Sequence, residues 1–445
     1  MWQFSLLAVS VVFIVAATTR FKLHPFLALL FAAFGYGLLT PGLSMVDVAK
    51  AVNDGFGGTI GSIGIVILAG SIIGTFLERS GGALTLAERT LRIVGERRIP
   101  AAMGLIGYIV SIPVFCDSGF VLLSPLNKAL SRKAKTSLAA GAMALALGLY
   151  ATHTMVPPTP GPVAGAAALD ADLGLVVLWG LPVAFVAAVA GWIFAVKVAS
   201  KIHIGDSELE QAEEWIALDH RPGVSKALLP ILVPIVLIVI RSIAGTAFEF
   251  PEGSAVAATI EFLGQPVVAL LIGVLLAFLL PKRLNKGMLA SDGWVGHAIV
   301  SAAGIIIITG AGGSFGKVLQ NSGIAGIIEQ HVGGQQLGIW LPFLLAAALK
   351  TAQGSSTVAI ITTANIMAPL MGAFGLESDT ARALVVVAIG AGSMVVSHAN
   401  DSFFWVVTQF SGMNVSQGYR LQTLGTLIEG TVAILTIWLL SLVVL

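Results

Sequence analysis

Long apolar runs, separated by short polar or basic segments, follow one another along the whole chain. Runs of about 20 apolar residues are long enough to cross a bilayer as α-helices, and they differ from the short alternating strands of a membrane barrel. The pattern predicts an all-α polytopic membrane protein with about eleven spans. The first run starts near Met1 with no basic region before it, which is typical of a span and not of a removable signal peptide.

One apolar run, at about residues 100–130, is interrupted at its middle by polar residues and flanked by basic residues at both ends. Positive charge marks cytoplasmic ends, so this run is expected to enter and leave on the cytoplasmic side as a re-entrant helical hairpin. Its tip carries Asp117, Ser118 and Gly119. An ionisable group inside the bilayer is costly unless it lines a cavity or has a partner, which favours a functional Asp117 over a neutral structural acid.

A second interrupted run, at about residues 339–372, has acidic residues and few basic ones near its ends. We interpret it as a second hairpin that dips from the external side. Its tip is the sequence Gln353, Gly354, Ser355, Ser356 and Thr357. Lys350, three residues earlier, is the one nearby cation, and its position leaves a role at a site open.

Two spans are expected to break near the middle of the membrane. Proline and glycine follow His153 and Thr154 in the span at about residues 136–169, and such a sequence cannot continue an α-helix. A polar sequence from His398 to Asp401 interrupts the span at about 380–410. Hydrocarbon tolerates such backbone only where protein or a wet cavity surrounds it.

The same order of parts occurs twice along the chain. We predict a first transmembrane repeat over residues 1–200, a cytoplasmic linker over 201–226 and a second repeat over 227–445. Each repeat holds one hairpin and one broken span, and the charge bias gives the two hairpins opposite orientations. This is an inverted-topology repeat with two broken helices, the architecture of secondary transporters whose site lies near the bilayer midplane.

Four polar interruptions that meet between two repeats would form an anion site. Broken helices present unpaired N–H groups at their N-terminal ends, which attract anions such as carboxylates. The candidate substrate-binding residues are Asp117, Ser118, Gly119, His153, Thr154, Thr159, Gln353, Gly354, Ser355, Ser356, Thr357, His398, Asn400 and Asp401. For each hydroxyl, the alternative is a bond to its own helix, and for each histidine a bond to unwound backbone.

A coupled proton has four candidate carriers. Histidine titrates near physiological pH, and a carboxyl group in a membrane cavity can also change its charge there. The candidates are Asp117, His153, His398 and Asp401. His398 and Asp401 would share a face if their segment were helical.

Composition narrows the function classes. Hydrophobic residues make up 56% of the chain and charged residues 11%, with a net charge of +1, so no nucleic-acid footprint is expected. A single cysteine, Cys116, excludes an internal disulfide or a cysteine-built zinc site, and no ligand-spaced cluster predicts another metal or a cofactor. An intramembrane hydrolase would need a nucleophile beside a base, and neither a Gly-x-Ser-x-Gly nor a His-Glu-x-x-His motif occurs. We therefore expect a transporter and not an enzyme.

The four interruptions resemble the gluconate permease (gluconate:proton symporter) family of bacterial inner-membrane carriers. The similar sequences are at residues 113–123, 153–162, 352–359 and 397–405, in order and in both halves. The family pattern often has valine or isoleucine where Ser118 stands and histidine where Thr159 stands.

The resemblance implies import of gluconate or a related sugar acid coupled to protons, in a multi-pass protein of the bacterial inner membrane. It also implies kinship with a wider ion-transporter superfamily, in which homodimers move substrate by an elevator motion. The two departures leave the substrate open, since relatives carry glycerate, 2-keto sugar acids and D-serine. Sodium coupling or exchange of another small carboxylate is the alternative mechanism.

Overall fold

The computed structural model describes residues 2–95, 98–204, 221–247, 250–251, 254–324, 338–399 and 401–445, and the regular elements in these ranges are all helical. Within them, five helices are long and apolar enough to cross a membrane, or up to seven if each of two bent helix pairs forms one span. Four further apolar helices are 10–17 residues long. These shorter helices are not long enough to count as membrane spans by length. The expected number of about eleven spans therefore stays a prediction.

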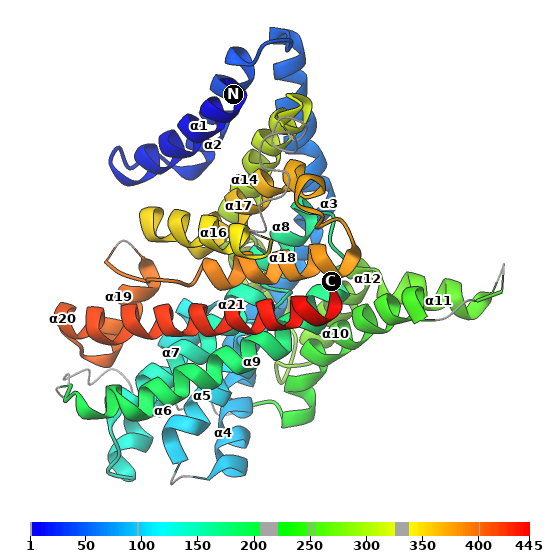
Figure 1. Cartoon of the computed structure of the whole chain (residues 1–445). Helices are drawn as coiled ribbons and strands as arrows, with labels where there is room; N and C mark the ends of the chain where they lie inside the picture. Colours follow the sequence, from blue (N-terminus) through cyan, green and yellow to red (C-terminus); the bar gives the residue numbers. More distant parts are fainter. Residues whose placement is uncertain are drawn as a thin grey trace.

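Two long helices form one side of the molecule: α3 (Met45–Arg79) and α14 (Trp294–Asn321) pack along each other (Figure 1). A Cβ at Gly55 would lie 2.4 Å from the carbonyl oxygen of Gly313, so the two backbones touch at this point. Ser44 caps α3, where its hydroxyl accepts from the backbone of Asp47 and the Asp47 carboxylate accepts from the backbone of Ser44. The helices α1 (Trp2–Thr19) and α2 (Pro25–Leu39) lie beside this pair.

The other side is a bundle around α7 (Leu138–Met155), which is buried from Ala139 to Met155. It packs on α5 (Ile99–Val110) and α9 (Leu173–Lys197), and α9 runs beside α21 (Leu424–Val444) (Figure 1). A Cβ at Gly148 would lie 2.2 Å from the carbonyl oxygen of Gly104. Glycine is therefore required where α5 crosses α7.

Two pairs of helices turn sharply at a few residues. The pair α5 and α6 (Cys116–Lys133) is joined by residues 111–115, and the pair α16 (Trp340–Gln353) and α17 (Ser356–Met367) by Gly354 and Ser355. Gly354 has φ +87°, a left-handed conformation that suits glycine, and it ends α16. The Ser355 hydroxyl then accepts from the N–H of Val358 at 3.3 Å and starts α17.

Two other helices are interrupted and resume. α7 stops at Met155, before Pro157 and Pro158, and α8 (Pro160–Ala168) follows. α18 (Asp379–Gly392) stops well before α19 (Ser402–Ser411) begins.

The backbone between α18 and α19 has partners outside its own helix. The N–H of Ser397 donates to Thr426 Oγ1 at 3.0 Å, and its carbonyl oxygen accepts from Thr423 Oγ1 at 2.6 Å. Side chains near the start of α21 thus replace the missing helical bonds, as buried irregular backbone requires.

The remaining elements surround these parts. Between α3 and α5 lies the amphipathic helix α4 (Gly82–Val94), whose leucines are buried. Most of the predicted 201–226 linker lies outside the described residues. The other helices are α10 (Val224–Ala247), α11 (Ala255–Gly264), α12 (Pro266–Ala277), α13 (Lys286–Leu289) and α20 (Val415–Gly418), with short turns η2 (Ala199–Lys201), η4 (Ala368–Leu370), η5 (Gly372–Phe374) and η6 (Tyr419–Thr423).

Candidate functional site

A cavity of about 230 Å³ lies where both sharp turns and both interrupted helices meet. We call it the hairpin cavity. It is slightly smaller than the usual range of about 300–1,000 Å³ for small-molecule sites. Its lining residues are Phe115, Cys116, Asp117, Tyr150, His153, Ile305, Ile308, Ser355, Ser356, Thr357, Val358, Ile361, Asp401, Ser402 and Phe403.

The first turn of α6 brings a carboxyl group to this cavity. Asp117 is the second residue of the helix, where negative charge is favoured by the helix dipole. Its Oδ1 atom is buried and has no hydrogen-bond partner. A buried carboxyl oxygen without a partner costs free energy, so this atom is available to a ligand or a proton.

The end of α7 contributes two aromatic side chains. His153 is buried, its ring lies 6.0 Å from that of Phe115 between centroids, and its Nδ1 has no partner. Tyr150, one turn earlier, packs its ring 5.0 Å from the Phe403 ring between centroids. The residue spacing of three places Tyr150 and His153 on one face of α7.

The first turn of α17 lines the opposite wall with hydroxyls and backbone. Ser355, Ser356 and Thr357 all border the cavity at the N-terminal end of this helix. The N–H groups of a helix's first turn have no partner within the helix. This end is therefore suited to an anionic group.

The start of α19 carries a carboxylate that is already fully engaged. Asp401 Oδ2 accepts from Lys350 Nζ at 2.6 Å, from Ser397 Oγ at 2.5 Å and from Tyr150 OH at 3.4 Å. Its Oδ1 accepts from the N–H of Phe403 at 3.1 Å and so caps α19. The ammonium of Lys350 is wholly buried. Asp401 and Lys350 thus form a closed buried pair that joins α16 to α19.

Six of the predicted site residues line the hairpin cavity, namely Asp117, His153, Ser355, Ser356, Thr357 and Asp401. Asn400 lies outside the described residues. The others are near the cavity along the chain but do not line it: Ser118, Gly119, Thr154, Thr159, Gln353, Gly354 and His398.

The contacts of these seven explain most of their positions. The hydroxyls of Thr154 and Thr159 donate to backbone carbonyls of Tyr150 and Val156, at 3.1 and 2.6 Å. His398 Nε2 lies 2.8 Å from the carbonyl oxygen of Thr351. Gly119 faces Leu149, where a Cβ would come within 2.8 Å of Cδ2. The amide of Gln353 is buried without a hydrogen-bond partner.

Several lining residues were not among the candidates. Tyr150 could have been found from its spacing to His153 on α7, and Ser402 and Phe403 from their position directly after Asp401. The isoleucine wall of Ile305, Ile308 and Ile361 has no such signal, because an apolar residue in an apolar helix is not distinctive.

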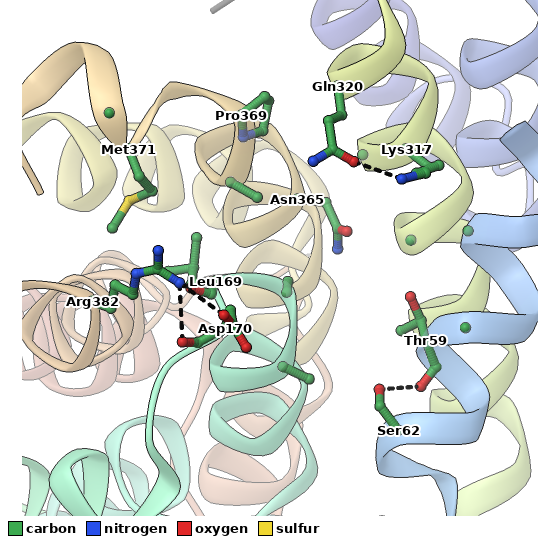
Figure 2. Close-up of a pocket in the computed structure, with 18 of the residues that line it drawn as sticks. Thr59, Ser62, Leu169, Asp170, Lys317, Gln320, Asn365, Pro369, Met371 and Arg382 are labelled. Carbon is green, nitrogen blue, oxygen red and sulfur yellow. Dashed lines mark hydrogen bonds and ion pairs between the residues drawn. The ribbon is translucent and has the colours of Figure 1, made fainter. Parts of the chain in front are cut away.

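A second, larger cavity of about 940 Å³ lies further along α14 and α17 (Figure 2). We call it the wide cavity. Asn365 of α17 and Gly313 of α14 line it, whereas Ile361 and Ile308 line the hairpin cavity. Asn365 is four positions after Ile361, which is about 6 Å along a helix. The two cavities therefore follow one another along the interface of α14 and α17.

The wide cavity has a charged rim. Arg382 Nη1 lies 3.0 Å from Asp170 Oδ2, and Lys317 Nζ donates to Gln320 Oε1 at 2.9 Å (Figure 2). Within the described residues, no group of three histidine, cysteine, aspartate or glutamate side chains is arranged to hold a metal ion.

Comparison with known proteins identifies the family. The family model described as "GntP family permease" matches residues 2–443. The chain belongs to this family.

Its relatives differ in what their names say they carry. A gluconate permease of Pseudomonas aeruginosa is 35% identical over 98% of this chain and 96% of that protein. The D-serine transporter DsdX of Escherichia coli is 32% identical over 100% of this chain and 99% of its own. The inner membrane permease YgbN of Escherichia coli is 33% identical over 96% of each chain. This chain is thus a multi-pass inner-membrane permease of the GntP family, not an enzyme.

A solved structure shares the fold. The YdaH transporter of Alcanivorax borkumensis superposes with a TM-score of 0.67, at 13% identity, over 93% of this chain and 97% of its own. This GntP permease therefore has a YdaH-like transporter fold.

Proposed function

We propose that this GntP permease is a secondary active transporter that imports gluconate or a related sugar acid by proton symport. The observation that carries the proposal is the hairpin cavity, where two helix N-termini and the unpartnered Asp117 and His153 meet. The carboxylate of the substrate binds at the first turn of α17, where N–H groups and three hydroxyl residues converge. The sugar hydroxyls bond Tyr150 and His153.

Charge supplies the link to protons. An anionic substrate in this cavity lies near Asp117, and two like charges close together in a poorly solvated space repel strongly. Protonation of Asp117 removes the repulsion and adds a hydrogen-bond donor. Binding of the substrate and binding of a proton then favour each other, as linkage requires. Asp401 is the weaker candidate for the proton carrier, because its oxygens already accept from Lys350, Ser397 and the N–H of Phe403.

The architecture proposed for this function is an inverted-topology repeat of about eleven spans, with α5–α6 and α16–α17 as re-entrant hairpins. The first dips from the cytoplasmic side and the second from outside. The wide cavity is then an external vestibule that follows the hairpin cavity along α14 and α17. An elevator-type movement of the hairpins and interrupted helices against α3 and α14 alternates access, with a homodimer as the fixed support.

D-serine transport is the second candidate, and one observation favours it. Among the described residues that line the hairpin cavity there is no lysine or arginine, whereas Asp117 has a free oxygen. A carboxylate without a partner can pair with the ammonium of an amino acid. Asp117 would then stay charged and bind the substrate directly, and proton coupling would need another group. Glycerate and 2-keto sugar acids remain further carboxylate candidates within the first proposal.

Uptake by proteoliposomes tests both candidates. Purified protein is reconstituted, and accumulation of labelled gluconate and of labelled D-serine is followed under an inward proton gradient or an inward sodium gradient. The proposal expects gluconate accumulation that depends on the proton gradient and that other sugar acids inhibit. Accumulation of D-serine alone selects the second candidate. Accumulation driven only by sodium contradicts proton symport.

A further inference from the structure

The ammonium of Lys350 occupies an unusual position for a lysine. Its side chain is wholly buried, three residues before the end of α16. The Nζ atom lies 2.6 Å from Asp401 Oδ2, donates to the carbonyl oxygen of Gly354, and lies 5.9 Å from the centre of the Tyr150 ring. Its neighbours are therefore a carboxylate, a helix-end carbonyl and an aromatic face.

These neighbours are the groups that hold small cations. The C-terminal end of a helix carries partial negative charge, and carbonyl oxygens at unwound helix ends coordinate the coupling ions of transporters built with broken helices. Carboxylate and carbonyl oxygens also suit hard metal ions. Two further oxygens, Ser397 Oγ and Tyr150 OH, surround the same Asp401 oxygen.

The first hairpin has no charge at the equivalent place. Counted from the N-cap residues Phe115 and Ser355, the residue five positions earlier is Val110 in the first hairpin and Lys350 in the second. The N-cap after the break is Thr159 in the first interrupted helix and Asp401 in the second. The cation and its carboxylate thus occur together, in one half only.

We propose that Lys350 is a built-in cation that fills a site otherwise suited to a monovalent metal ion such as Na⁺. The tethered ammonium joins the tip of the α16–α17 turn to the start of α19, which is the task of a bound ion between a hairpin and a broken helix. Transport then needs no dissolved Na⁺ for this contact. Removal of the ammonium, with Asp401 retained, exposes an anionic oxygen cluster that binds Na⁺.

The ion-binding part of this proposal is independent of the substrate, while its meaning for coupling rests on the proposed function. An ordinary buried ion pair makes a different prediction, because neutralising both partners of such a pair is tolerated and an added salt has no specific effect. The two can be separated by measuring ion binding without any sugar acid present.

The experiment compares Lys350→Ala with the double variant Lys350→Ala/Asp401→Asn and with the unaltered chain. Each is purified in detergent, and its thermal unfolding is followed in choline chloride and in NaCl at equal ionic strength. The expected result is a saturable rise in the midpoint of Lys350→Ala with Na⁺, on the order of 3 °C, with no rise in the other two. The double variant is the matched control because it lacks the carboxylate that would hold the ion.

Two results would overturn the proposal. One is a folded Lys350→Ala protein whose midpoint is the same in NaCl and choline chloride. The other is a Lys350→Ala protein that cannot be recovered folded even in NaCl, because the added ion is expected to replace the missing charge. If the unaltered chain did not transport gluconate, the proposed function would be contradicted. The Na⁺ measurement would still test the present proposal.

Discussion

Two units of this molecule have the same order of helices and handle charge in opposite ways. The first unit is α5 to α8, and the second is α16 to α19. At matched places the second unit has Lys350 and Asp401, paired at 2.6 Å, where the first has Val110 and Thr159. The first unit instead keeps Asp117 and His153, each with a buried atom that has no partner.

The difference assigns separate tasks to the two units. In the second unit the charges satisfy each other, so this unit offers a ligand mainly the hydroxyls and N–H groups of α17. In the first unit the charge-bearing groups remain open toward the cavity. Buried polar atoms without partners are rare in folded proteins, and they often mark a place where a ligand or proton binds. We therefore expect substitutions in the second unit to affect stability most, and those in the first to affect transport.

The largest effect on stability is expected at Asp401. Asp401→Ala leaves the buried ammonium of Lys350 without its carboxylate, and loss of one partner of a buried pair costs about 3–5 kcal/mol. Unfolding of the purified protein measures this cost. The matched control is Thr159→Val, which removes one buried hydroxyl bond to Val156 and should cost about 1 kcal/mol. Equal losses of unfolding free energy in the two variants would mean that the charged pair does not stabilise the second unit more than the hydroxyl stabilises the first.

The largest effect on transport is expected at Asp117. Asp117→Asn keeps the size of the side chain and a hydrogen-bond donor, but it cannot take up or release the coupled proton. Coupling between two binding events is typically about 1–3 kcal/mol, so gluconate uptake driven by the proton gradient should fall about fivefold to 150-fold. The unfolding midpoint should change little, because asparagine has nearly the same size and Asp117 Oδ1 has no partner within the protein.

Two outcomes would count against this role of Asp117. One is normal uptake driven by the proton gradient in Asp117→Asn. The other is a loss of stability as large as that of Asp401→Ala, which would make Asp117 a structural acid. Ser118→Ala is the control, since Ser118 is adjacent in sequence and does not line the cavity.

A smaller effect is expected at His153. His153→Gln replaces a ring whose Nδ1 has no partner with an amide of different reach. A neutral hydrogen bond contributes about 0.5–1.5 kcal/mol, so the apparent affinity for gluconate should fall about twofold to tenfold. Competition binding measures it, with His398→Gln as the control, because His398 contacts backbone at Thr351 instead of the cavity. An equal effect of both substitutions would remove His153 from the ligand site.

Local chemistry made part of this site predictable from the sequence. Pro157 and Pro158 end α7 where a helix cannot continue, and Gly354 ends α16 with a positive φ. These residues act through their own backbone, so their effect can be read without knowing the neighbours. Asp117, His153 and Ser356 lie beside such helix interruptions, and they line one cavity because the interruptions meet there.

Tertiary packing decides the rest. Lys350 and Asp401 are far apart in sequence, and nothing local distinguishes a lysine that forms a buried pair from one that binds a ligand. His398 and Asp401 were expected to share a helical face only if their segment were helical, and α19 starts after both, at Ser402. Thr154 donates to its own helix, the alternative that was left open for every hydroxyl.

The smallest effect is expected where the two units touch at their exposed ends. Arg382, in the first turns of α18, pairs with Asp170 after α8 at 3.0 Å, and the Asp170 side chain is 96% exposed. Exposed ion pairs contribute about 0–1 kcal/mol and are screened by salt. Arg382→Gln should therefore lower the free energy of unfolding by less than about 1 kcal/mol, and less still in 1 M salt. Asp170→Asn should match it; a larger, salt-independent loss in Arg382→Gln alone would instead implicate its bonds to the backbone of Glu377 and Leu169 in holding the units together.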